Sequence, residues 1–452
     1  MREMKDSGIE WIGEIPTNWK LVPLKYLLSN EIDSLRVGPF GSTLKGTDFT
    51  NEGYWVYNQR TVLDCNFDAN DTFISEEKYH TMTGFQIRYN DILITTRGTI
   101  GKICRIPKKY YKGIIHPCII KFRINEDKVL YPYLELIFNS SNLFQTQLTY
   151  KSNATTIEVI YSGTLKNLLV PIPASLTLQK QISKYLIQRC NKIDSIVNDI
   201  QHQIELLQEY KQSVITEAVT KGLDKNVAMK DSGIKWIGDI PEDWTIGPFY
   251  NFLDDKINTI VDGPFGSNLK NEEYVDEGVP VIQLGAIRDN GMDFSNMHYV
   301  TEEKANLLKR HNASPNDIVI AKMMPAGKAC EVSNDYERYV VSADVVKASV
   351  ANDEIRKFLV YALNVCATIQ AQIEAQGSTR ARVNIGKIKR FKIPHPPQND
   401  QMNAIVKYLD QKCSEIDAII ADKQKQLDKL NEYKKSLIYE YVTGKKEVPA
   451  DA

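Results

Sequence analysis

The chain has 452 residues, of which 42% are apolar, and its formal net charge at pH 7 is −1. This length predicts about two to four domains, each with enough apolar residues for an ordinary core. The near-neutral charge excludes a general electrostatic attraction to nucleic acids or membranes, so any DNA-binding surface must come from local basic patches.

Cysteine usage and the absence of apolar runs indicate the compartment. The seven cysteines are scattered singly, with no CxxC pair. This pattern is typical of reduced thiols in a cytoplasm and argues against a zinc module. The N-terminal segment lacks the apolar stretch of a signal peptide, and no apolar run approaches about 18 residues. We therefore expect a cytoplasmic protein without transmembrane helices.

The chain contains a tandem repeat. The segment MKDSGIEWIGEIPTNW begins at Met4, and MKDSGIKWIGDIPEDW begins at Met229, an offset of 229 − 4 = 225. Further blocks recur in the same order, namely GPFGS at Gly38 and Gly263, NDI[LV]I at Asn90 and Asn316, and YK[QK]S[VL]I at Tyr210 and Tyr433. Since the offsets stay between 223 and 226, the two copies differ by small loop insertions and should share one fold.

Each copy begins with a mixed segment and ends in a long helix. Short strand-like runs such as residues 91–95 and 317–320 alternate with Gly-rich turns, and a helix is expected within residues 131–148 and 353–375. This pattern predicts an α+β globule in each copy. The resulting division is a first globule at 1–175, a central helix at 176–222, a second globule at 223–397, a C-terminal helix at 398–445 and a tail at 446–452.

Both long helices carry a coiled-coil seam. In the central helix, apolar residues recur at alternating steps of four and three, and the C-terminal helix follows the same rhythm. So narrow an apolar stripe, flanked by polar residues, requires a partner helix rather than a broad core. The seam residues are Ile193, Val197, Ile200, Ile204 and Leu207, and Leu409, Ile416, Ile420, Leu427 and Leu430.

The two helices are expected to pair with each other in opposite directions. Antiparallel pairing lets the C-terminal helix return from the second globule toward the first through short connections. The sequence therefore predicts two globules joined by an antiparallel two-helix coiled coil with a pseudo-two-fold axis. The extensive polar flanks disfavour the alternative of a bundle within one packed domain.

Catalytic signatures are missing from the sequence. There is no GxxxxGK[ST] loop, no GxGxxG fingerprint, no HExxH pair, and no [DN]PP[YFW] run of an adenine methyltransferase. We therefore expect a binding protein rather than an enzyme, with no metal site of its own.

Basic segments without acidic residues are the best candidates for nucleic-acid contact. They run from Arg97 to Lys112 and from Arg380 to Lys392. Lysine, arginine and hydroxyl side chains in Gly-containing loops suit phosphate contact, and arginine also reads guanine. The candidate DNA-binding residues are Ser42, Lys45, Arg97, Lys102, Lys151 and Thr155 in the first copy, and Ser267, Lys270, Lys322, Lys328, Thr379, Arg380 and Arg382 in the second.

Four tryptophans occupy the repeated entry segments. Trp11 and Trp19 flank an Ile-Pro turn in the first copy, as Trp236 and Trp244 do in the second. Base stacking on such rings is one interpretation. We favour a structural role, in which they fix each globule to the helix pair.

Taken together, these blocks resemble the specificity subunit of type I restriction–modification systems. The similarity rests on DSGIxWIGxIPxxW, GPFGS, NDI[LV]I and the heptad helix ending in Tyr-Lys-x-Ser, in both halves and in one order. The resemblance implies two target recognition domains, each reading half of a split asymmetric DNA site. It also implies that the paired helices set the distance between the half-sites.

The resemblance further implies partners that carry the chemistry. Such a subunit is non-catalytic, docks two methyltransferase subunits, and joins motor-nuclease subunits through the complex. S-adenosylmethionine and ATP with Mg²⁺ would be used by those partners. The alternatives are a stand-alone bipartite DNA-binding or architectural protein, an enzyme with an unrecognised site, and a coiled-coil scaffold for other proteins.

Overall fold

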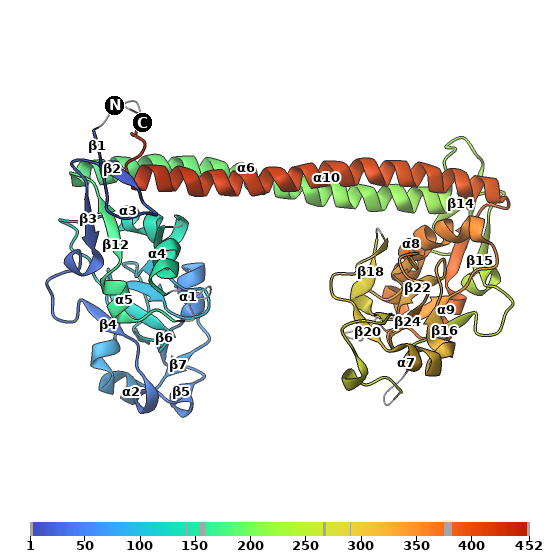
Figure 1. Ribbon diagram of the computed structural model, residues 1–452, viewed down its shortest axis with the longest axis horizontal. Helices are drawn as coiled ribbons and strands as arrows, with labels where there is room; N and C mark the ends of the chain where they lie inside the picture. The colour runs from blue at the N-terminus through green and yellow to red at the C-terminus, as the bar shows by residue number, and fades with distance from the viewer. Residues whose placement is uncertain are drawn as a thin grey trace. The chain divides into compact units, whose positions relative to one another are not determined.

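A computed structural model describes residues 3–141, 143–152, 159–264, 268–289, 291–374 and 382–449 (Figure 1). The chain forms two compact units. Unit 1 comprises Met1–Gln201 and Gln424–Ala452, and unit 2 comprises His202–Lys423. Each unit holds one complete globule together with a segment of each long helix.

The globule of unit 1 is built on two four-stranded sheets, with strand orders β10-β6-β7-β5 and β4-β11-β8-β9, and two strand pairs, β1-β2 and β3-β12. The strand bounds are β1 Met4–Asp6, β2 Glu14–Pro16, β3 Lys20–Pro23, β4 Leu35–Val37, β5 Phe49–Thr50, β6 Tyr54–Tyr57, β7 Phe73–Ile74, β8 Ile92–Thr95, β9 Ile103–Arg105, β10 Gly113–Ile115, β11 Ile119–Phe122 and β12 Leu169–Ile172.

The globule of unit 2 repeats this plan with sheets β16-β25-β22-β23 and β20-β17-β24-β21, strand pairs β13-β14 and β15-β26, and an added hairpin β18-β19. Its strands are β13 Met229–Asp231, β14 Asp239–Pro241, β15 Thr245–Pro248, β16 Ile260–Asp262, β17 Val279–Ile282, β18 Ile287–Arg288, β19 Gly291–Met292, β20 His298–Val300, β21 Asn312–Ala313, β22 Ile318–Ala321, β23 Ala329–Glu331, β24 Tyr339–Val341, β25 Val345–Ala348 and β26 Lys392–His395.

Helices cover the sheets and continue beyond them. They are α1 Gln59–Asp64, α2 Glu76–Thr81, α3 Tyr131–Glu135, α4 Leu143–Ser152, α5 Ser162–Lys166, α6 Leu176–Lys221, α7 Glu302–Leu307, α8 Arg356–Glu374, α9 Ile385–Arg390 and α10 Asn399–Val442. The expected single helix at 131–148 is wrong, because a π-helical turn at Leu136–Ser140 separates α3 from α4. Its counterpart α8 is continuous.

The central strands explain why the globules fold alike. All four residues of β8, β11 and β22 are buried, and β25 is buried except for Lys347. Such Val/Ile-rich runs, bounded by turn residues, are typical of strands covered on both faces. The strands expected at 91–95 and 317–320 are therefore confirmed as β8 and β22.

Antiparallel packing of the long helices is visible within each unit. In unit 1, Lys434 Nζ on α10 donates to both carboxylate oxygens of Asp194 on α6, at 2.6 and 2.7 Å. In unit 2, Lys211 on α6 makes the equivalent pair with Asp417 on α10, at 2.8 and 2.7 Å. The residue numbers of each pair give the same sum (194 + 434 = 628 and 211 + 417 = 628), so higher numbers on one helix meet lower numbers on the other.

The helix seam is packed in both units. Six of its residues are buried and the other four are partly buried. The buried set comprises Ile193, Ile200, Ile204, Leu409, Ile416 and Leu427, and the partly buried set comprises Val197, Leu207, Ile420 and Leu430. Burial of a heptad seam beside polar flanks is the arrangement that coiled-coil packing requires.

In each globule, one buried tryptophan packs against the end of a long helix. A Cβ on Gly222, just after α6, would lie 3.2 Å from the ring of Trp244, and a Cβ on Gly444, just after α10, would lie 3.2 Å from the ring of Trp19. Both glycines have φ of +75°, the left-handed conformation that ends helices. Trp19 and Trp244 are buried, which supports their structural role.

Candidate nucleic-acid interface

Two equivalent hairpins, β8-β9 and β22-β23, carry Arg97, Lys102, Lys322 and Lys328, and a partly buried asparagine fixes each hairpin. In unit 1, Asn139 accepts from the Ile103 N–H and donates to the Ile103 carbonyl, both at 2.8 Å. In unit 2, Asn364 makes the same pair of bonds with Ala329, at 2.8 and 2.9 Å. Each asparagine therefore replaces a neighbouring strand on the edge of β9 or β23 and sets the position of the hairpin.

The base of each hairpin is closed by a buried aspartate. Asp91 accepts from the backbone N–H of Arg88 at 2.7 Å and from Arg123 Nε at 2.5 Å. Asp317 accepts from the backbone N–H of Ser314 at 2.8 Å and from the Ser349 hydroxyl at 2.6 Å. The aspartates are equivalent in the repeat, but within the part of the chain that the structure describes a cation pairs with Asp91 and none with Asp317.

Each hairpin loop lies beside the segment that leads out of its globule. The Ile160 N–H donates to the Thr96 carbonyl, and the Val383 N–H donates to the Lys322 carbonyl, both at 2.9 Å. Arg97 and Arg382, one residue away from these bonds, are both exposed. Each globule thus has an exposed arginine at the contact between its hairpin loop and its exit segment, Arg97 on the loop in unit 1 and Arg382 on the exit segment in unit 2.

The candidates in unit 1 have different exposures. Ser42, in the 3-10 turn Gly41–Thr43, is exposed, as are Lys45 and Arg97. Lys102 is half-buried, its Nζ donates to the Asn139 carbonyl, and burial together with Lys434 and Lys435 lowers its pKa. In this structure Lys102 therefore links the β8-β9 hairpin to the π-helical turn that contains Asn139, and its ammonium group is not free.

Ion pairs occupy three of the four candidates in unit 2 that the structure describes. Lys270 is exposed. Lys328 pairs with Asp289 at 3.2 Å, and Arg382 pairs with Asp344 at 2.6 Å. Lys322 is 4% exposed, and its Nζ bonds Asp262 and the Ala343 carbonyl. The expectation of a DNA contact by Lys322 is corrected, because burial and these partners keep its ammonium group away from a ligand.

The remaining candidates cannot be placed. The side chain of Lys151, on α4, and residues Thr155, Ser267, Thr379 and Arg380 lie outside the described residues.

A basic turn in unit 2 was missed by the sequence reasoning. Lys309 and Arg310 are exposed on a 3-10 turn, and His311 Nδ1 lies 2.6 Å from the Asp262 carbonyl, just before the GPFGS block. The sequence does contain a signal for this turn, namely three consecutive basic residues, Lys309 to His311, with no acidic residue next to them in the chain. They extend the candidate surface of the second globule.

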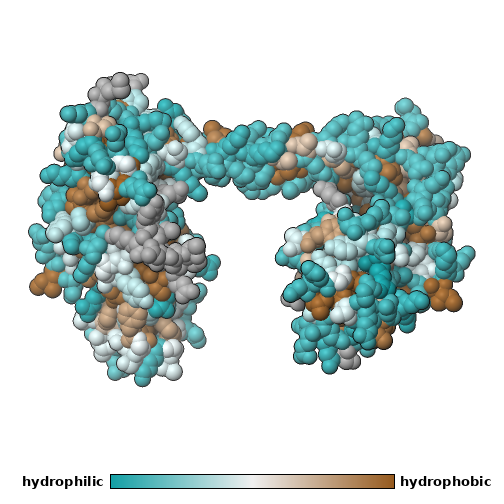
Figure 2. Space-filling model, in the orientation of Figure 1, coloured by the Kyte–Doolittle hydropathy of each residue, from teal (hydrophilic) through white to brown (hydrophobic). Residues whose placement is uncertain are grey.

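Among the described residues, no group of three or more His, Cys, Asp or Glu side chains is arranged to hold a metal ion. Within the same ranges, none of the helices combines the length and apolarity needed to cross a membrane. Figure 2 shows a largely hydrophilic surface with isolated hydrophobic side chains on the long helices.

The family model of the type I restriction modification DNA specificity domain matches residues 40–206 and 266–438. The chain belongs to this family. Its two matched segments are two target recognition domains of a type I specificity subunit, as the resemblance implied. The expected α+β fold with two repeated domains and an antiparallel helix pair is likewise confirmed.

Relatives of the specificity subunit span its whole length. The MjaVIII specificity subunit of Methanocaldococcus jannaschii is 23% identical, covering 95% of this chain and 93% of the relative. The EcoBI specificity subunit of Escherichia coli is 21% identical, covering 98% and 89%. A solved structure from work on complex assembly and conformational transition of the type I R-M system has a TM-score of 0.62 at 16% identity, covering 95% and 98%.

Proposed function

We propose that this specificity subunit is non-catalytic and reads a split DNA site, with one half-site bound by each recognition domain. The observation that carries the proposal is the repeat itself. The scaffold bonds of Asn139 and Asn364 are the same, whereas the hairpin loops they support, residues 96–102 and 322–328, differ in sequence. Similar scaffolds with different loops suit two readers of different sequences.

Phosphate contacts would position each domain, and base contacts would select the sequence. In the first domain Arg97 and Lys45 are exposed cations, and in the second Arg382, Lys309 and Arg310 are exposed. A good bidentate arginine contact to guanine discriminates against other bases by about 1–3 kcal/mol. The subunit would work in the cytoplasm, where it has access to genomic DNA.

The proposal is tested by Arg97→Ala and Arg382→Ala in the full-length subunit. We expect each variant to bind the intact site about 10-fold more weakly, within the range of one lost base or phosphate contact. Competition with DNA in which one half-site is scrambled shows which half-site each recognition domain reads. Arg97→Ala should lose preference for one half-site only, and Arg382→Ala for the other. Equal loss at both half-sites in both variants would contradict the two-reader proposal.

Methyltransferase subunits are proposed to dock on the helix pair, one in each unit. Unit 1 exposes Ile196 and Tyr433, and unit 2 exposes Tyr210 and Ile419, with exposed fractions between 46% and 54%. Their numbers sum to 629 in both units (196 + 433 and 210 + 419), so each pair lies at nearly one level of the helix pair. Two equal apolar patches suit two copies of one partner.

A charge placed on one patch tests this docking. We expect Ile196→Glu with Tyr433→Glu to reduce the methyltransferase copies that copurify from two to one, because a glutamate cannot be buried there without a partner. The matched control is Ile187→Glu, since Ile187 is 41% exposed on α6 but its repeat equivalent is Asp410. Retention of two copies by the patch variant would overturn the assignment.

S-adenosylmethionine and ATP with Mg²⁺ would be bound by these partners and the motor-nuclease subunits.

A further inference from the structure

Two thiols meet in the first recognition domain at the junction between α1 and β9. Cys104 lies on β9 and is fully buried in a core cluster with Val62 of α1. Cys65 is exposed directly after α1, which packs against β9, so both thiols lie at the contact between α1 and β9. The pair therefore joins a solvent-accessible sulfur to a buried one.

The backbone at Cys65 is unfavourable for a residue with a side chain. Cys65 ends α1 at φ 47° and ψ 37°, and its N–H donates to the Thr61 carbonyl. Glycine or asparagine is usual at such a left-handed helix end, and other residues cost about 1–2 kcal/mol there. Strained backbone of this kind is common at functional positions, and at this residue it fixes where the Cys65 thiol lies.

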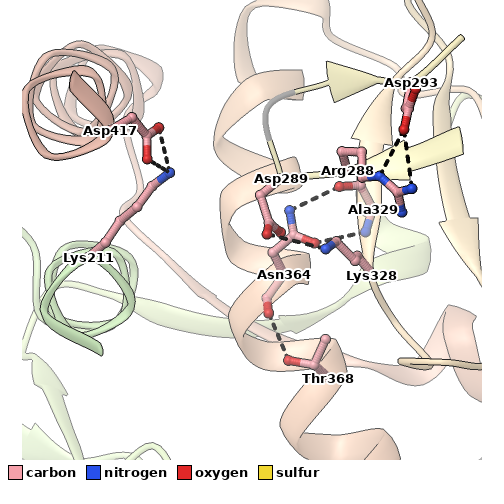
Figure 3. A network of polar contacts seen from close by, with 9 residues as sticks. All are labelled: Lys211, Arg288, Asp289, Asp293, Lys328, Ala329, Asn364, Thr368 and Asp417. Atoms are coloured by element: carbon pink, nitrogen blue, oxygen red, sulfur yellow. Dashed lines mark hydrogen bonds and ion pairs between the residues drawn. The ribbon is translucent and has the colours of Figure 1, made fainter. Parts of the chain in front are cut away.

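The second recognition domain makes the same junction without a thiol pair. Cys330 is the repeat equivalent of Cys104 (330 − 104 = 226) and is also buried. The β18-β19 hairpin takes the place of α1, and the ion pairs Lys328–Asp289 and Arg288–Asp293 lie at this junction (Figure 3). At this junction the second recognition domain therefore has ion pairs where the first has two thiols.

We propose that Cys65 and Cys104 form a peroxide-reactive dithiol that closes to a disulfide within the first recognition domain. The Cys65 thiolate attacks a peroxide oxygen, the O–O bond breaks, and Cys65 becomes a sulfenic acid. The Cys104 sulfur then attacks the Cys65 sulfur, and the sulfenic hydroxyl leaves as water. In total, two thiols and one hydrogen peroxide give one disulfide and two waters.

Electrostatics favour Cys65 as the attacking sulfur. The hydrogen bond from Cys104 lowers the pKa of Cys65 to about 7, whereas burial raises the pKa of Cys330 to about 12. About half of Cys65 is then thiolate at pH 7, compared with about 3% for an ordinary cysteine of pKa 8.5. After allowance for the weaker nucleophilicity of a low-pKa thiolate, we expect Cys65 to react roughly three- to fourfold faster than an ordinary cysteine.

The test uses the full-length protein in its native state. Iodoacetamide at pH 7, followed by peptide mass spectrometry, should label Cys65 at least three- to fourfold faster than the half-buried Cys118 and should leave Cys330 unlabelled. In a separate sample that has not been alkylated, hydrogen peroxide should remove two hydrogens per chain and link the Cys65 and Cys104 peptides.

Matched variants separate the two roles. With Cys104→Ala, peroxide should stop at a sulfenic acid on Cys65 that dimedone traps, and with Cys65→Ser no disulfide should form. Labelling of Cys65 at the rate of Cys118, or disulfides that join two chains instead of the two peptides of one chain, would overturn the proposal.

Discussion

Replacing Asp91 with alanine is expected to destabilise the first recognition domain by about 3 kcal/mol, because it removes the counter-charge of the buried Lys121 and one of the two carboxylates that pair with Arg123. Asp91 is 1% exposed and accepts from Arg123 Nε, and the Nζ of the 6%-exposed Lys121 lies 4.0 Å away. Burial already lowers the pKa of Lys121, and Asp91 opposes that effect. Without the Asp91 carboxylate, Lys121 would have to keep its positive charge in a buried position that has lost the adjacent negative charge offsetting the lost solvation.

The matched variant is Asp317→Ala in the second recognition domain. Asp317 bonds a backbone N–H and the Ser349 hydroxyl, which are neutral donors. Its loss should cost about 1–2 kcal/mol, the range for unsatisfied neutral groups. Hydrogen exchange of β8 and β22 in the full-length protein measures each domain separately. Equal loss of protection at the two strands would show that the ion pair adds nothing to the scaffold.

The repeat and the heptad rhythm were sufficient to predict the body plan. Identical blocks at offsets of 223–226 require two similar folds, and a narrow seam can be buried only by a second helix. The role of Trp19 and Trp244 followed from their place beside Ile-Pro turns in both copies. These features are local in sequence or appear twice, so no long-range information was needed.

The interface residues were less predictable because their environment is set by distant parts of the chain. Lys322 is buried by a partner 60 residues earlier, Asp262, and Lys102 is held by the Asn139 carbonyl. No pattern around either lysine reveals these contacts. The break between α3 and α4 was missed for the same reason, since Asn139 in the π-helical turn bonds β9 rather than its own helix.

The resemblance implied that the paired helices set the distance between the half-sites, and we propose that they do so in this subunit. Lengthening the helix pair should lengthen the DNA spacer that the subunit selects. Residues 203–209 and 426–432 are equivalent heptads (426 − 203 = 223), so adding copies of each at the same level keeps the seam in phase. Three added heptads extend each helix by about 32 Å. That length is about nine base pairs, close to one DNA turn of 34–36 Å.

The decisive measurement is selection of bound DNA from a library with spacers of every length between the two half-sites. The native subunit should select one spacer, and the variant extended in both helices should select one about nine base pairs longer with unchanged half-sites. Extension of α6 alone is the control, because it leaves seven-residue repeats without partners and should abolish spacer selection. An unchanged spacer in the doubly extended variant would contradict the claim that the paired helices set the distance.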